Sequence, residues 1–264
     1  MGDHKRRKLE VDQIAVVAAE ISPQEFFEQF VVSRVPAKFS NIINDSNWKG
    51  SEWTNEALRE KSGDAVLRVE SRSSSTESFG RGNEAKMTFS TFLDSLEGET
   101  ETSYYLTTQE LSYTHEGQPS LTSPPVDGLI GGFPWVPKLC GNLIPQNISM
   151  WFGSSKLPTS SGLHHDFHDN LYILLRGEKR ITLFSPEDAH NMYTVGEIEK
   201  VHPNGRINYK GQPTNAGKID ELALQFSSGC LLHLCIMQDN MIDHYYVVFL
   251  VLVLVNSIDI PCSF

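Results

Sequence analysis

The segment SGLHHDFHDN, residues 161–170, continues as LYILLRGEKRITLF, residues 171–184, and this stretch decides the fold expected for the chain. It places His164 and Asp166 two residues apart, and such residues of a β-strand point to the same face of the sheet. Both side chains can then bind one metal ion. The pair is the sequence-local part of the two-histidine, one-carboxylate triad that holds non-haem Fe(II). By itself a His-x-Asp pair is more often a surface or turn feature, so the residues around it decide whether it indicates a metal site.

The residues after this pair have the pattern of a β-hairpin. Residues 170–175 read as an apolar strand, 176–178 as a tight turn and 179–184 as a returning strand. Alternation on the second strand places Lys179 on the same face as two aliphatic residues. An ammonium group there is costly unless it meets an anion. A dicarboxylate cosubstrate bound to the metal would supply that anion; the alternative is an ordinary edge-strand lysine that hinders aggregation.

The motifs His164-x-Asp166, Asn170-Leu171 and Gly177-x-Lys179 together resemble the core of the Jumonji-C (JmjC) oxygenases, in particular the small members of that family. The resemblance implies that His164 and Asp166 bind Fe(II) and act as the catalytic centre. It also implies a set of side chains that hold the cosubstrate 2-oxoglutarate, namely Tyr105, Ser161, Asn170 and Lys179.

The resemblance runs from about residue 22 to about residue 210 and is most specific from 147 to 186, where residues 147–153 resemble the strand before the metal strand. It implies a mainly β fold with flanking helices (α+β), a double-stranded β-helix or cupin jelly roll with N-terminal helices. The implied activity is hydroxylation of a protein side chain or demethylation of methyl-lysine. The partner would be a protein substrate, such as a histone or another nuclear protein.

The N-terminal third predicts helices that lead into the barrel. Ser22-Pro-Gln-Glu25 is a capping box with proline at the first helical position, and Pro36 limits the helix that follows. Further elements are expected at residues 53–58 and 88–94 (helices), 65–70 (a strand), 71–83 (a loop) and 121–136 (a turn-rich segment).

The C-terminus departs from the family pattern. Residues 222–264 contain no Lys, Arg or Glu, and residues 245–255, YYVVFLVLVLV, are apolar without interruption. This run is too short to span a membrane as a helix, and is either a buried strand or an aggregation-prone segment. The motif around the family's second iron-binding histidine is missing, and His244 matches it by spacing alone. We expect a frameshifted, mis-spliced or intron-derived C-terminus.

Three regions are therefore predicted: a basic, disordered N-terminus (1–21), a JmjC cupin-like domain (22–221) and an atypical apolar tail (222–264) that leaves the barrel incomplete. Two functional interpretations remain open. The chain is either an active oxygenase or a catalytically silent cupin-like module, an isoform that lacks the third iron ligand.

Composition restricts the partners and the compartment. The formal net charge of −11 argues against direct nucleic-acid binding, which needs a basic face, and no membrane association is expected. The four cysteines show neither zinc-site nor disulfide spacing, and the charged N-terminus lacks a signal-peptide pattern. We expect an intracellular protein. The Lys5-Arg6-Arg7-Lys8 cluster is either a nuclear import signal or a solubilising terminus of a cytoplasmic protein.

Overall fold

The computed structural model describes residues 14, 16–17, 20–40, 45–72, 83–98, 102–110, 112–154 and 169–184, together with the backbone of four later strands. The basic N-terminal cluster and most of the predicted loop at 71–83 lie outside these residues. Within the described part of the chain, no helix is both long and apolar enough to cross a membrane.

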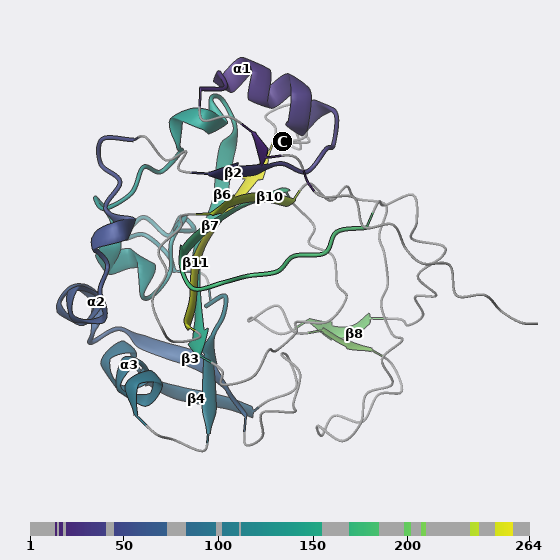
Figure 1. The fold of residues 1–264 in the computed structure, drawn as a ribbon. Helices are drawn as coiled ribbons and strands as arrows, with labels where there is room; N and C mark the ends of the chain where they lie inside the picture. Colours follow the sequence, from purple (N-terminus) through teal and green to yellow (C-terminus); the bar gives the residue numbers. More distant parts are fainter. Residues whose placement is uncertain are drawn as a thin grey trace, which may run out of the picture.

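A nine-stranded sheet in the order β1-β2-β10-β7-β11-β6-β5-β3-β4 organises the molecule, and short helices cover one side of it (Figure 1). Its strands are β1 (Val16–Val17), β2 (Lys38–Ser40), β3 (Val66–Arg72), β4 (Asn83–Thr88), β5 (Ser103–Leu106), β6 (Ile144–Ser154), β7 (Asp169–Arg176), β10 (His233–Met237) and β11 (Tyr246–Val255). Strands β8 (Ile198–Val201) and β9 (Ile207–Tyr209) pair with each other. The predicted mainly β architecture with flanking helices is confirmed.

The first helix begins as the sequence predicts. Helix α1 (Pro23–Phe26) continues as the π-helical turns of η1 (Phe27–Val32). The backbone N–H of Glu25 donates to Ser22 Oγ at 3.2 Å, and the N–H of Ser22 donates to Glu25 Oε2 at 3.0 Å. Both halves of the capping box are present, so two N–H groups that the helix itself cannot pair are satisfied.

This helix ends with a common hydrogen-bond pattern but with an unusual residue in the left-handed position. The N–H of Val35 donates to the Phe30 carbonyl and that of Arg34 to the Val31 carbonyl, which is a Schellman motif. Arg34 occupies the left-handed position, with φ of 55°, where glycine is usual. A side chain in that conformation costs roughly 1–2 kcal/mol. The half-exposed ion pair of Arg34 with Asp169 (N–O 2.6 Å) recovers only about 0–1 kcal/mol.

Two further helices, α2 (Asn55–Ser62) and α3 (Phe89–Glu97), confirm the predictions at 53–58 and 88–94 and extend beyond them. The hydroxyls of Thr54 and Thr88 cap them by accepting N–H groups of the first turn. The 3-10 turns are η2 (Gly50–Glu52), η3 (Val126–Leu129) and η4 (Lys138–Cys140). Strand β4 was missed, because its side chains are exposed or half-buried and show no apolar alternation.

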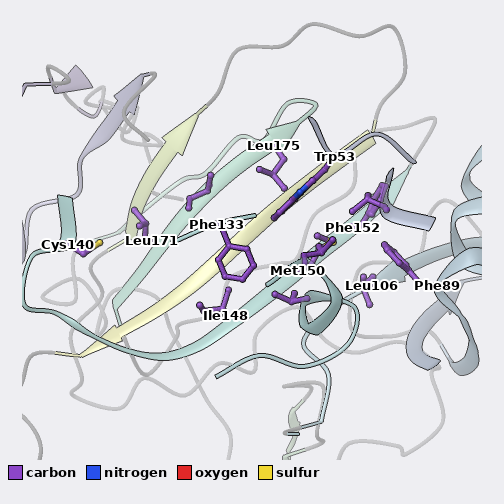
Figure 2. Close-up of a cluster of buried hydrophobic side chains, with 14 of the residues drawn as sticks. Trp53, Phe89, Leu106, Phe133, Cys140, Ile148, Met150, Phe152, Leu171 and Leu175 are labelled. Atoms are coloured by element: carbon purple, nitrogen blue, oxygen red, sulfur yellow. The ribbon is translucent and has the colours of Figure 1, made fainter. Parts of the chain in front are cut away.

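The helix-facing side of the sheet is the hydrophobic core. Alternate residues of the two long strands lie on this side: Ile148, Met150 and Phe152 of β6, and Leu171, Ile173 and Leu175 of β7. Figure 2 shows members of this cluster gathered along the strands together with Trp53, Phe89 and Phe133. Each of these large side chains contributes about 1.5–3 kcal/mol by leaving water.

The apolar C-terminal run is a strand of this sheet. Strand β11 lies between β6 and β7 and pairs antiparallel with both. Its backbone groups therefore have ladder partners on both edges, which an unpaired tail would lack. Of the two interpretations of residues 245–255, the strand is confirmed. The division of the chain at residue 221 stays a prediction.

Candidate functional site

The other face of the sheet carries several buried polar side chains, beside the aromatic rings of Tyr105 and Trp151. Along β6, Asn147, Ser149, Trp151 and Gly153 alternate with the core residues, and the Ser149 hydroxyl donates to the Asn147 side-chain oxygen. The buried polar residues of the sheet include Glu70, Arg72, Ser149 and Asn170. Buried polar side chains are costly unless they are hydrogen-bonded. A sheet with one apolar and one buried polar face is suited to line a ligand site.

Tyr105 lies on this polar face in β5, opposite Gly153 of β6 and Glu70 of β3. Its ring lies over Gly153, where a Cβ would come within 2.3 Å of Tyr105 Cδ2. On the same side, the ring centroid of Trp151 is 6.2 Å from that of Tyr105. Burial raises the pKa of Tyr105, and the negative charge of Glu70 raises it further, whereas Arg72 opposes this. Tyr105 is therefore a protonated phenol, which can donate a hydrogen bond to an anion.

The close approach of Tyr105 to Gly153 leads to a prediction. Gly153→Ala should push the buried ring from its position and lower the free energy of unfolding by about 1–3 kcal/mol. Urea denaturation would measure the change. The neighbouring Ser154→Ala, which adds no atoms, is the control and should have a much smaller effect. Equal stability of the Gly153→Ala variant and the parent would show that the ring moves without cost.

Asn170 is buried at the start of β7, beside Asp169. Val253 of β11 is the register partner of both Asn170 in β7 and Asn147 in β6, so the two asparagines lie at the same height along the strands. Tyr105, in contrast, is the register partner of Gly153 of β6. Six residues of β6, about 20 Å of strand, separate the two levels. Tyr105 and Asn170 thus share the polar face, as the predicted cosubstrate site requires, but the strand registers place them at different levels.

Lys179 follows the predicted turn, where Gly177 has a φ of 89°. The predicted returning strand is wrong: residues 179–184 are extended but belong to no strand, and in Figure 1 this green segment runs away from the sheet. Both edges of β7 are already paired, with β10 and β11, so a hairpin partner has no place there. The predicted alternation is nevertheless present, because Lys179, Ile181 and Leu183 are half-buried and the residues between them are exposed.

The predicted metal ligands His164 and Asp166, the cosubstrate residue Ser161 and the candidate third ligand His244 all lie outside the described residues. Their roles stay predictions. Among the residues that the structure does describe, no three His, Cys, Asp or Glu side chains are grouped so that they could hold a metal ion. Residues 155–168, which carry the predicted ligands, connect the end of β6 to the start of β7.

Sequence reasoning missed three features near this site. Glu70 and Arg72 are buried on the polar face of β3, and the alternation of Leu67 and Val69 with charged residues was the signal for them. His233 of β10 lies opposite Asn170 in the strand register. No local signal identifies His233, since its place depends on pairing between strands far apart in sequence.

Comparisons of the sequence with known proteins identify its family. The model of the cupin-like domain family matches residues 23–245. JmjC domain-containing protein 4 of Schizosaccharomyces pombe is 37% identical over 217 residues, which are 77% of this chain and 45% of that protein. Lysine-specific demethylase JMJ32 of Arabidopsis thaliana is 33% identical over 90 residues, 34% of this chain and 24% of that protein.

The aligned regions thus span less than half the length of both relatives. The family match, in contrast, covers most of this chain and all of the strands from β2 to β10. The predominance of β-strands over a few short helices agrees with the jelly roll of that family. The protein therefore belongs to the cupin-like domain family of JmjC type.

Proposed function

We propose that this domain is an Fe(II)- and 2-oxoglutarate-dependent oxygenase that hydroxylates a protein side chain or demethylates methyl-lysine. The observation that carries the proposal is the buried polar face of the sheet, on which Tyr105 and Asn170 lie. The segment with the His164-x-Asp166 pair connects the two strands that form the middle of this face.

In the proposed site each residue has a chemical task. His164 and Asp166 would hold Fe(II), whose chemistry with dioxygen and 2-oxoglutarate supplies the oxidation of a C–H bond. The half-buried Lys179 is suited to pair with the distal carboxylate of the cosubstrate. The Asn170 amide and the Ser161 hydroxyl would donate hydrogen bonds that orient it. The protonated phenol of Tyr105 lies about 20 Å of strand from the level of Asn170, so one cosubstrate molecule would contact only one of these two side chains.

The name of one relative motivates the proposal that the substrate is a protein. The Arabidopsis relative is named a lysine-specific demethylase, which makes a lysine side chain of a histone or another nuclear protein a candidate substrate here. The Lys5-Arg6-Arg7-Lys8 cluster would direct the chain to the nucleus. We propose no direct contact with nucleic acid or membrane.

The C-terminus favours a second candidate function, a catalytically silent cupin-like module. Tyr246, two residues after His244, begins β11 and is the register partner of Ser154. Asp169, three residues after Asp166, begins β7 and is the register partner of Leu254, near the other end of β11. Eight residues of β11, about 26 Å of strand, separate these levels. The segments that lead to His244 and to Asp166 thus begin at opposite ends of β11. This arrangement disfavours His244 as the third ligand.

Cosubstrate turnover distinguishes the two candidates. With two protein ligands we expect weak, poorly selective binding of divalent metal, and decarboxylation of 2-oxoglutarate near background. Succinate formation by the purified chain with added Fe(II), compared with Asp166→Ala, measures this. A chain rejoined to a family C-terminus that contains the second iron-binding histidine should gain Fe(II)-dependent turnover that Asp166→Ala abolishes. If that restored chain is inactive while it binds metal, the oxygenase proposal is wrong.

A separate prediction concerns the third ligand. His244→Ala should leave metal affinity unchanged within error, because the start of β11, next to His244, lies about 26 Å of strand from the level of Asp169, which follows the predicted metal ligands. Titration of the chain with Mn(II) measures the affinity. His233→Ala serves as the comparison, because His233 of β10 lies beside Asn170, level with the start of β7. Strong Fe(II)-dependent turnover that His244→Ala abolishes would make His244 the third ligand and exclude the silent module.

A further inference from the structure

Arg34 is the only non-glycine residue with positive φ among the residues that the structure describes. It occupies the position after the helix end where glycine relieves the backbone, and its ion pair does not outweigh the strain. The ion pair with Asp169 therefore does not by itself explain why an arginine stands at this position. Backbone strain that the rest of a fold maintains is concentrated at functional sites, so the contact of its side chain is informative.

That contact lies at the candidate site. Arg34 Nη1 donates to Asp169 Oδ2 at 2.6 Å, across 135 positions of sequence. Asp169 is the first residue of β7, immediately before the buried Asn170 and three residues after Asp166. The pair thus fixes the N-terminal helix to the point where the predicted metal segment enters the sheet.

The far end of β7 is anchored independently. Arg176 Nη2 donates to Asn55 Oδ1 of α2 at 2.9 Å, and its guanidinium lies 5.4 Å from the ring centroid of Phe152. This second anchor faces the hydrophobic core. Loss of the Arg34–Asp169 pair should therefore loosen the first residues of β7, while the ladders with β10 and β11 keep the strand in the sheet.

We infer that Arg34 is a positioning residue, which holds the start of β7 through Asp169 so that the buried Asn170 keeps its position. The link to ligand binding rests on the proposed function, whereas the mechanical link between helix and strand does not.

The test separates stability from position. Arg34→Gly removes both the strain and the ion pair, so its melting temperature should equal or exceed that of the parent chain. Amide hydrogen exchange at residues 169–171 should nevertheless become faster. With Mn(II) and without turnover, the dissociation constant for 2-oxoglutarate should rise by up to about fivefold, the equivalent of the interaction that is lost.

Further variants identify the ion pair as the cause. Asp169→Asn should reproduce the faster exchange, and the exchanged pair Arg34→Asp with Asp169→Arg should restore slow exchange. Arg59→Ala, which removes the Arg59 contacts with Asp94 (2.8 Å) and Glu97 (2.5 Å), is the matched control and should leave exchange at 169–171 unchanged.

The outcomes are distinguishable. Unchanged exchange at residues 169–171 in Arg34→Gly, or a fall in its melting temperature as large as that of a core variant, would overturn the inference. If the chain rejoined to a family C-terminus binds neither Mn(II) nor 2-oxoglutarate, the proposed function fails. Hydrogen exchange then still decides whether Arg34 positions the start of β7.

Discussion

Lys179→Ala should weaken 2-oxoglutarate binding by roughly ten- to a hundredfold. The side chain is half-buried on the same side as Ile181 and Leu183, and there its ammonium group would pair with the distal carboxylate of the cosubstrate. A hydrogen bond to a charged group contributes about 1.5–3 kcal/mol, and every 1.4 kcal/mol is a factor of about ten in affinity. Calorimetric titration with 2-oxoglutarate in the presence of Mn(II) measures the loss.

The neighbouring residue provides a control for charge alone. Arg180 is exposed and on the other side of the extended segment, so Arg180→Ala removes the same formal charge without touching the proposed site. Its affinity for 2-oxoglutarate should stay within about twofold of the parent, as expected for a screened surface charge. If both variants bind like the parent, Lys179 does not meet the cosubstrate.

Phe152→Ala should lower the free energy of unfolding by about 3–5 kcal/mol, the usual range for a buried phenylalanine. Phe152 is fully buried in the middle of the sheet. Its ring makes an edge contact with Phe92 of α3, with 5.6 Å between centroids, and it also lies beneath the guanidinium of Arg176. The variant would leave a cavity between sheet and helices that rigid strands cannot close.

Urea denaturation followed by circular dichroism measures this loss. Phe184→Ala is the matched control, because Phe184 is 37% exposed and follows the last strand of the described core. Its effect should stay below about 1 kcal/mol, as for most exposed positions. A similar loss in both variants would mean that the core assignment is wrong.

Local interactions made several elements of this fold predictable. The capping box at Ser22, the helices that begin after Thr54 and Thr88, and strands β3, β6 and β7 all follow from residues within a few positions of one another. The half-buried and exposed alternation of residues 179–184 is equally local. For the candidate site, the family resemblance indicated Tyr105 and Asn170; the structure places both on the same face of the sheet, about 20 Å of strand apart, and their roles stay predictions.

Strand pairing across long sequence separations was not predictable in the same way. Nothing in residues 179–184 reveals that β10 and β11 occupy both edges of β7, and nothing near Arg34 reveals that it pairs with Asp169. The apolar run of β11 predicted only a buried strand or an aggregating segment. Its place between β6 and β7 depends on which strand edges remain free.

The sequence alone determined the three helices, the strands β3, β6 and β7, and the family. These depend on short-range periodicity and on motifs of fixed spacing. The tertiary structure alone decided the order of the strands, the different levels of Tyr105 and Asn170, and the strained contact of Arg34 with β7. The physical reason is that pairing register and long-range ion pairs arise from competition among all strands for a limited number of hydrogen-bonding edges.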